Sequence, residues 1–327
     1  MSRTGLFVVV NHTAARARAA WPRVREALTR AGVPFESHES TREGETEEYT
    51  RGALERGFRT VAAVGGDGTL SAAANGFFEP CAELSEGALP SAVNAAASLA
   101  LLPAGTGDDF ARGLSGGRRE PLEAWAEKLI RHCRGDAPLE ETFKRVDVLL
   151  GSVDGGARRF VCLNAATLGV GAEVAARVAA QGRTVRRLPG EARFALAALP
   201  RLAAWRDRRV RVQVDGRVWQ ECGTNLLAVI NGTYAGGGMN FSPEAKLDDG
   251  LLDVLAVCRI SRPALLRELS RVHTGGHLDN PRVKLTRGTH VSIEASDDSL
   301  GVEADGDPRG RTPAEFRVMP AALSVVC

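Results

Sequence analysis

Residues 61–69 read Val-Ala-Ala-Val-Gly-Gly-Asp-Gly-Thr, and the class of fold follows from this stretch. A short apolar run followed by glycines and a helix-compatible segment favours a buried strand, a tight turn and a helix. Glycines at such a turn let the backbone approach a phosphate, and the helix N-terminus offers unpaired N–H groups. The stretch is neither a Walker A loop nor a GxGxxG dinucleotide fingerprint. Taken alone, it also fits an ordinary strand–turn–helix connection.

The first third of the chain repeats this rhythm of strand and helix. Apolar runs at residues 6–10, 61–64 and 99–102 alternate with amphipathic stretches at residues 14–31 and 70–78. Apolar runs of this length are typical of parallel strands that helices cover on both faces. The pattern therefore predicts an α/β domain with a parallel sheet.

From residue 145 onward, short β-rich segments separated by turns replace this rhythm. The expected strands are residues 145–150, 157–165, 210–214, 225–231, 251–257, 290–295 and 315–320. Their spacing suits an antiparallel β-sandwich. Between them, residues 172–205 are expected to be helical.

Length and composition bound the remaining possibilities. The chain has 327 residues, of which 44% are hydrophobic and 25% charged, so a folded protein of two domains is expected. The net charge of +2 is too small to indicate nucleic-acid binding. No apolar run is long enough to cross a bilayer, and residues 1–11 do not resemble a signal peptide. We therefore expect a cytoplasmic protein.

Six cysteines are scattered through the sequence without CxxC or Cys/His ligand spacing. Their separation predicts neither a disulfide framework nor a zinc site. We expect reduced, mostly buried thiols.

A second glycine loop occupies residues 103–112, Pro-Ala-Gly-Thr-Gly-Asp-Asp-Phe-Ala-Arg, and again follows an apolar run. Taken alone, Asp108 and Asp109 are best read as acids at a helix N-terminus. Two such loops after two parallel strands would, however, lie together at the carboxyl edge of one sheet, where open α/β folds bind ligands. Jointly they predict a site with two carboxylates, a bound phosphate and a divalent metal.

Further motifs lie in the β-rich half. Residues 231–238 read Asn-Gly-Thr-Tyr-Ala-Gly-Gly-Gly, residues 243–254 contain Leu-Asp-Asp-Gly, and residues 303–307 read Glu-Ala-Asp-Gly-Asp. Each has an ordinary explanation as a tight turn between strands.

In this order, these segments resemble the diacylglycerol kinase catalytic-domain family, which includes bacterial diacylglycerol kinases, related lipid kinases and sphingosine kinases. GGDGT is shared with NAD kinases, but the GTGxDFAR and PxAxLDDGLLDV segments are similar to the lipid branch. The resemblance implies an α/β nucleotide-binding domain over residues 1–143, a β-sandwich lipid-substrate domain over residues 144–308, and an active cleft between them. It also implies that residues 309–327 return to the first domain.

The resemblance implies roles for particular residues as well. Asp67 would lie near the transferring phosphate and its Mg²⁺, Asp109 would be its companion acid, and Asp307 stands where the family carries its general-base Glu. A structural Mg²⁺ would be held by Asp249 and the backbone carbonyls of Lys246 and Leu251. The nucleotide contacts would be Asn11, Thr41, Gly65, Gly66, Asp67, Gly68, Thr69, Gly105 and Thr106.

The sequence also departs from the family pattern. Ser71 and Ala72 replace the usual Asn-Glu after GGDGTL, Asp108 replaces the usual Asn, and Asp307 is one methylene shorter than Glu. Residues 11–15 stand where the family has Asn-Pro-x-Ser/Thr-Gly, and only Asn11 matches.

The activity implied is an ATP- and Mg²⁺-dependent transfer of phosphate to a lipid hydroxyl, with diacylglycerol giving phosphatidic acid. The enzyme would act on lipid at the membrane surface as a peripheral protein, without nucleic acid, and a homodimer is left open. A non-catalytic nucleotide-binding regulator and an NAD kinase-like metabolite kinase are the alternatives. A basic stretch fits either anionic headgroups or a solvated helix face. It comprises Arg183, Arg186, Arg187, Arg193, Arg201, Arg206, Arg208, Arg209 and Arg211.

Overall fold

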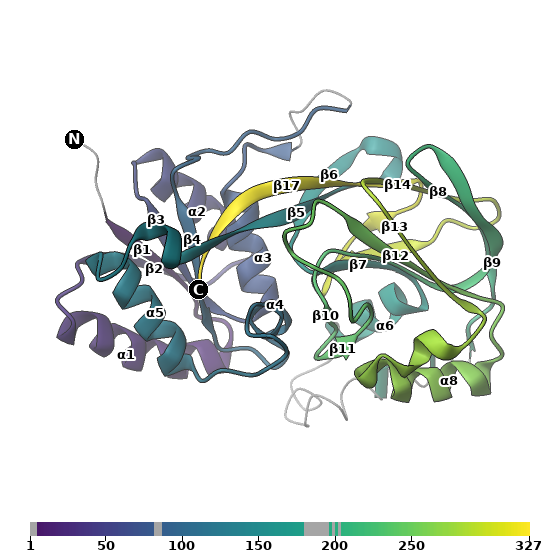
Figure 1. The fold of residues 1–327 in the computed structure, drawn as a ribbon, viewed down its shortest axis with the longest axis horizontal. Coiled ribbons are helices and arrows are strands. Elements are labelled where there is room, and N and C mark those ends of the chain that lie inside the picture. Colours follow the sequence, from purple (N-terminus) through teal and green to yellow (C-terminus); the bar gives the residue numbers. More distant parts are fainter. Residues whose placement is uncertain (1–4, 82–86, 180–195, 198–199, 202–203) are drawn as a thin grey trace. The chain divides into compact units, whose positions relative to one another are not determined.

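Two segments of the chain, Met1–Val148 and Pro320–Cys327, build the first unit of the structure, and Leu149–Met319 builds the second (Figure 1). This computed structural model describes residues 5–81, 87–179, 196–197, 200–201 and 204–327.

The first unit contains a parallel sheet whose strand order is β17-β4-β3-β1-β2. Its strands are β1 (Leu6–Asn11), β2 (Phe35–Ser40), β3 (Thr60–Gly65), β4 (Ser98–Pro103) and the end of β17 (Ala314–Val326). The side chains of β1, β3 and β4 are almost entirely buried, as a sheet covered on both faces requires. The predicted α/β domain is confirmed.

Five helices accompany this sheet. They are α1 (Ala15–Arg30), α2 (Glu45–Glu55), α3 (Asp67–Gly76), α4 (Asp109–Leu114) and α5 (Leu122–Arg134). Figure 1 shows α1 beside α5 and α2 beside α3, on opposite faces of the strands. In α1, the buried Ala17, Trp21, Val24 and Leu28 recur every three or four residues, which gives the helix one apolar face.

The second unit is antiparallel and is built around the long strand β9, which pairs with β7, β8 and β12. The strand order β16-β15-β7-β9-β8-β14-β17 runs through it, and β12 continues to β13. The described residues of this unit include the helices α6 (Val170–Ala179) and α8 (Arg262–Arg271). The strands are β5 (Phe143–Val153), β6 (Arg158–Cys162), β7 (Ala165–Gly169), β8 (Arg208–Val214), β9 (Arg217–Ile230), β10 (Tyr234–Ala235), β11 (Met239–Asn240), β12 (Leu252–Cys258), β13 (Val283–Gly288), β14 (His290–Ala295), β15 (Gly301–Ala304) and β16 (Asp307–Arg311).

Two expectations for this unit need correction. Residues 157–165 form two strands, β6 and β7, because a turn at Leu163 and Asn164 interrupts the apolar run. The expectation that all cysteines are reduced was also wrong, because Cys222 and Cys258 form a disulfide. They are 36 residues apart in sequence, but β9 and β12 are antiparallel neighbours and bring the two Cα atoms within 6.2 Å.

The expected helical segment, residues 172–205, is described only in part. Helix α6 covers its beginning, and residues 180–195, 198–199 and 202–203 lie outside the described residues. In the parts of the chain that the structure describes, no helix combines the length and the hydropathy that a bilayer span needs.

Candidate active site

Four loops of the first unit follow the carboxyl ends of adjacent parallel strands. Strand β1 ends at Asn11 and pairs with β2, whose last residue, Ser40, precedes Thr41. Strand β3 ends at Gly65, which pairs in register with Pro103 at the end of β4. The predicted nucleotide-binding segments of this unit therefore meet at one edge of the sheet, where α/β folds hold ligands.

The loop after β1 and the segment after β3 are joined by a hydrogen bond. The Asn11 side-chain amide donates to Thr69 Oγ1 at 3.0 Å, while Asn11 Oδ1 accepts from the Thr13 amide at 3.1 Å. A Cβ on Gly65 would lie 2.3 Å from Thr69 Oγ1, so only glycine fits at Gly65. Asn11 thus fixes both its own loop and the start of α3, which contains Gly68.

The two glycine loops touch each other backbone to backbone. A Cβ on Gly66 would lie 3.0 Å from the Gly105 Cα, and a Cβ on Gly105 would lie 2.6 Å from the Gly66 Cα. The second glycine loop, which follows β4, is closed by Asp108, whose Oδ1 accepts from the Gly105 amide at 2.8 Å. Asp108 has a left-handed backbone with φ 51° and precedes the first residue of α4.

The predicted acid pair occupies the starts of two helices. Asp67 begins α3, Asp109 begins α4, and Asp67 Oδ1 accepts from the Phe110 amide at 3.2 Å. Burial and, to a lesser extent, the Asp109 charge raise the pKa of the Asp67 carboxyl to about 7, against the effect of the Phe110 and Asp109 amides. The structure therefore brings together the two carboxylates that the sequence singled out.

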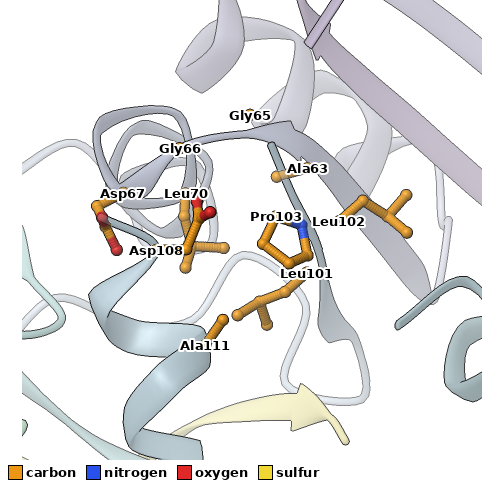
Figure 2. Close-up of a pocket in the computed structure, with 10 residues that line it drawn as sticks. All are labelled: Ala63, Gly65, Gly66, Asp67, Leu70, Leu101, Leu102, Pro103, Asp108 and Ala111. Carbon is orange, nitrogen blue, oxygen red and sulfur yellow. The ribbon is translucent and has the colours of Figure 1, made fainter. Parts of the chain in front are cut away.

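A pocket lies beside these acids (Figure 2). Figure 2 shows Asp67 and Asp108 along one side and the end of β4 along the other. Its lining comprises Ala63, Gly65, Gly66, Asp67, Leu70, Leu101, Leu102, Pro103, Asp108 and Ala111. Polar groups thus lie on one side of the pocket and apolar side chains on the other.

Two arginines that lie outside the predicted motifs hold the second glycine loop. Arg16 donates to the Gly105 carbonyl at 2.8 Å, and Arg119 donates to the carbonyls of Thr106 and, at 2.8 Å, Gly107. They come from α1 and from the segment after α4, so no local motif connects them with the loop. The Thr106 side chain itself is exposed.

Thr41 is held by a carboxylate at the start of α2. Glu45 Oε2 accepts from the Thr41 amide at 2.6 Å and from the Arg42 amide at 3.0 Å. These amides and the Arg42 side chain lower the pKa of Glu45 to about 2. Glu45 therefore stays ionised and fixes the loop that contains the exposed Thr41.

In the second unit, two of the turn motifs converge on the turn between β6 and β7. Asp305 carboxylate oxygens accept from the amides of Leu163 at 2.8 Å and Asn164 at 2.9 Å. On the other side, the Asn231 side chain donates to the Leu163 carbonyl at 2.8 Å, and the Gly232 amide donates to the Asn164 carbonyl at 2.9 Å. The sequence indicated neither connection, because the segments are about 140 and 70 residues apart.

Asp307 begins β16 directly after a two-residue turn. Asp305 and Gly306 form this turn with φ 50° and 94°, as the Asp-Gly signature predicts. The Asp307 side chain is 56% exposed, and its Oδ2 lies 3.7 Å from Arg309 Nη2. The carboxylate is therefore accessible, as a general base must be.

The Leu-Asp-Asp-Gly loop lies between β11 and β12. Asp249 is exposed, and its Oδ1 accepts from the Leu251 amide at 3.1 Å across Gly250, whose φ is 72°. The donors that the resemblance implies here are one carboxylate and the carbonyls of Lys246 and Leu251. These are all oxygens and so suit a hard cation.

Metal-binding side chains are sparse in the described ranges of the chain. No three side chains of His, Cys, Asp or Glu among these residues gather closely enough to hold a metal. Asp67 and Asp109 nevertheless fit a Mg²⁺ that takes its other ligands from water and phosphate, as this ion commonly does. Burial and then the Asp109 charge raise the pKa of Asp67, and a bound cation would offset both effects.

The basic stretch is described only from Arg201 onward, and Arg183, Arg186, Arg187 and Arg193 lie outside the described residues. Arg201 and Arg208 approach Glu173 at 3.7 and 3.9 Å, and Arg211 pairs with Glu221 at 3.2 Å. Much of the positive charge in its described part is therefore compensated within the unit.

Comparisons with known proteins match both units. A family model described as "Diacylglycerol kinase catalytic domain" matches residues 5–138, and one described as "YegS C-terminal NAD kinase beta sandwich-like domain" matches residues 166–327. The second match supports the β-sandwich fold predicted for the second domain. The two matches together cover most of the chain, in the order that the motifs indicated.

Relatives agree with these matches. A "Probable lipid kinase YegS-like" protein of Pseudomonas aeruginosa (strain UCBPP-PA14) is 31% identical, over 86% of this chain and 81% of its own. The "Diacylglycerol kinase" of Bacillus subtilis (strain 168) is 24% identical, over 90% and 86%. A crystal structure of a diacylglycerol kinase from Bacillus anthracis str. Sterne has the same fold, with a TM-score of 0.68 and 20% identity over 99% and 96%. The chain therefore belongs to the diacylglycerol kinase catalytic-domain family, among relatives that are named as lipid kinases.

Proposed function

We propose that this chain is an ATP- and Mg²⁺-dependent lipid kinase that phosphorylates a lipid hydroxyl, with diacylglycerol as acceptor and phosphatidic acid as product. The observation that carries the proposal is the contact of Gly66 with Gly105, which places Asp67 and Asp109 together at the carboxyl edge of the sheet. Family membership supports the kinase class. The names of the relatives support lipid as the acceptor.

In this proposal the glycine loops bind the nucleotide phosphates through their backbone amides, which glycine leaves accessible. Thr69 and Asn11 keep the first of these loops in place. Asp67 and Asp109 hold Mg²⁺, which when bound neutralises charge on the phosphates. The structural cation at Asp249 belongs to the same proposal.

Asp307 accepts the proton of the lipid hydroxyl. The lipid oxygen then forms a bond to the γ-phosphorus while the bond from this phosphorus to the bridging oxygen of ADP breaks. Asp307 later gives the proton to water. The expected active cleft between the domains stays a prediction, as do action at the membrane surface and a homodimer.

The test is transfer from radiolabelled ATP to a panel of lipids in mixed micelles, with NAD included as a soluble acceptor. We expect labelled phosphatidic acid from the wild type, and loss of transfer in Asp67→Ala with the fold kept by circular dichroism. Glu123→Gln is the matched control, because Glu123 is an exposed acid in the first turn of α5 and should be silent.

Two results would contradict the proposal. If ATP binds but no acceptor is labelled, the chain is a regulator of the same fold. If NAD is labelled and lipid is not, it is a metabolite kinase. Near-wild-type transfer in Asp67→Ala would remove this acid from the site.

A further inference from the structure

The turn that precedes Asp307 is held from two sides by carboxylates to which the proposed reaction gives no role. Glu303 lies on β15, is buried, and accepts from Thr167 Oγ1 on β7 at 2.6 Å and from the Gly306 amide. Asp305 accepts from the amides of Leu163 and Asn164. Each carboxylate thus ties the turn to a different part of the sheet.

The backbone adds to this attachment. The Asp305 amide donates to the Ala165 carbonyl at 3.1 Å, and β15 pairs with β7 through Val302, Glu303 and Ala304. The turn therefore cannot shift without breaking the hydrogen bonds that Glu303 and Asp305 accept. A two-residue Asp-Gly turn needs no such support to form.

We propose that Glu303 and Asp305 are positioning residues that hold the Asp305–Gly306 turn in one place and so set the reach of Asp307. The inference rests on the proposed function of Asp307 as general base. Aspartate has one methylene less than the Glu of the family pattern, so its side chain has less freedom to reach the lipid hydroxyl. The position of the Asp307 carboxylate therefore depends more on the backbone. Displacement of a reacting group by about 1 Å can cost about 10²-fold in rate.

A matched turn elsewhere in the second unit provides the control. Asp215 and Gly216 connect β8 to β9 with φ 50° and 77°, and Asp215 accepts from the amides of Thr289 at 2.9 Å and His290 at 3.0 Å. This Asp-Gly turn has the same backbone handedness and the same kind of amide clamp, but no residue of the proposed reaction follows it.

The experiment compares Asp305→Asn, Glu303→Gln, Glu303→Leu and Asp215→Asn. For each, kcat, the KM for ATP, the melting temperature and the hydrogen exchange of the turn amides are measured. We expect Asp305→Asn and Asp215→Asn to lower the melting temperature similarly. Only Asp305→Asn should lower kcat, by about 10- to 10²-fold, with the KM for ATP unchanged. Glu303→Gln, which keeps an acceptor for the Gly306 amide, should lose less than Glu303→Leu.

The inference is overturned if Asp305→Asn and Asp215→Asn lower kcat equally, or if Asp305→Asn speeds exchange at Gly306 while kcat stays at the wild-type value. Failure of the proposed function has a different signature, because the wild type would then label no lipid. In that case the exchange of the Gly306 amide still tests the clamp: unchanged exchange in both Asp305→Asn and Glu303→Leu refutes it.

Discussion

At Gly105 the chain has room for a hydrogen atom and nothing larger. A Cβ there would meet the Gly66 Cα at 2.6 Å and Asp108 Oδ1 at 2.5 Å, and the Gly66 backbone cannot rotate away. Gly105→Ala should therefore push the two loops apart at an overpacking cost of about 1–3 kcal/mol. If the loop amides bind the nucleotide phosphates as proposed, this displacement should also weaken ATP binding roughly tenfold or more.

Isothermal titration with ATP checks this prediction, and Gly52→Ala is its control. Gly52 lies inside α2, and apart from its own helix backbone and chain neighbours no atom lies within 4 Å of the position that a Cβ would take there. Alanine should therefore keep ATP affinity and stabilise the helix by roughly 0.5–1 kcal/mol. Equal ATP affinity in both variants would show that the loop contact has no role in binding.

Asp307 permits a test in both directions. As the proposed base, it should lose about 10²-fold or more in kcat on substitution by Asn, with little change in ATP binding. Asp307→Glu should keep the activity or increase it, since it restores the acid that the family pattern has there. Steady-state kinetics with one accepted lipid decides: a silent Asp307→Asn means that the base lies elsewhere.

Among the secondary-structure elements, those with continuous apolar runs were predictable and those with mixed patterns were not. Strands β1, β3 and β4 and helix α1 appear where their hydrophobic residues indicated. Strand β2, with the sequence Phe-Glu-Ser-His-Glu-Ser, has mostly polar side chains because it pairs only with β1 and so forms the sheet edge. The polar sequence of β2 carries no local strand signal, and the pairing with β1 that makes it a strand cannot be read from residues 35–40 alone.

The candidate site divides in the same way. Gly65, Gly66 and Asp67 were readable because one strand and one helix place them. The contacts that hold the second glycine loop and the Asp305–Gly306 turn could not be predicted. Arg16 is 89 residues from Gly105 in the sequence, and Asp305 is 141 residues from Asn164. Such contacts depend on which strands become neighbours, and single motifs do not contain that information.

The Leu-Asp-Asp-Gly loop carries a prediction at the scale of an element. If Asp249 and its loop carbonyls hold a structural cation, Mg²⁺ should raise the melting temperature of the wild type, and Asp249→Ala should abolish that rise and lower activity. Thermal melts with and without chelator measure it, with Asp248→Asn as the neighbouring control. A wild-type melting temperature that does not depend on Mg²⁺ would rule out the site.

For the molecule as a whole, the buried Glu303 makes the free energy of unfolding depend on pH. Burial, with the nearby Asp305 and Asp307 charges, raises the pKa of its carboxyl from 4.5 to about 7, against the effect of Thr167 and the Gly306 amide. The folded state therefore binds more protons than the unfolded state between these values. The contribution of Glu303 to stability is complete below about pH 4.5 and is lost as pH rises through 7.

Glu303→Gln removes this titration and should flatten the fall in unfolding free energy between pH 5 and about 8. Urea unfolding at a series of pH values measures it, with Asp215→Asn compared in parallel. If Glu303→Gln keeps the wild-type slope, another group is responsible for the pH dependence.

The return of the chain to its first unit has a consequence for how the protein is made. Residues Ser324–Val326 of β17 pair with Ser98–Ala100 of β4, so this edge of the parallel sheet is completed by residues that are synthesised long after β4. Until they leave the ribosome, the apolar strand β4 has an unpaired edge, and such edges readily pair with other chains. The nascent protein therefore keeps this edge exposed while the whole second unit is being synthesised, which makes it a natural client for chaperones that shield unpaired strands.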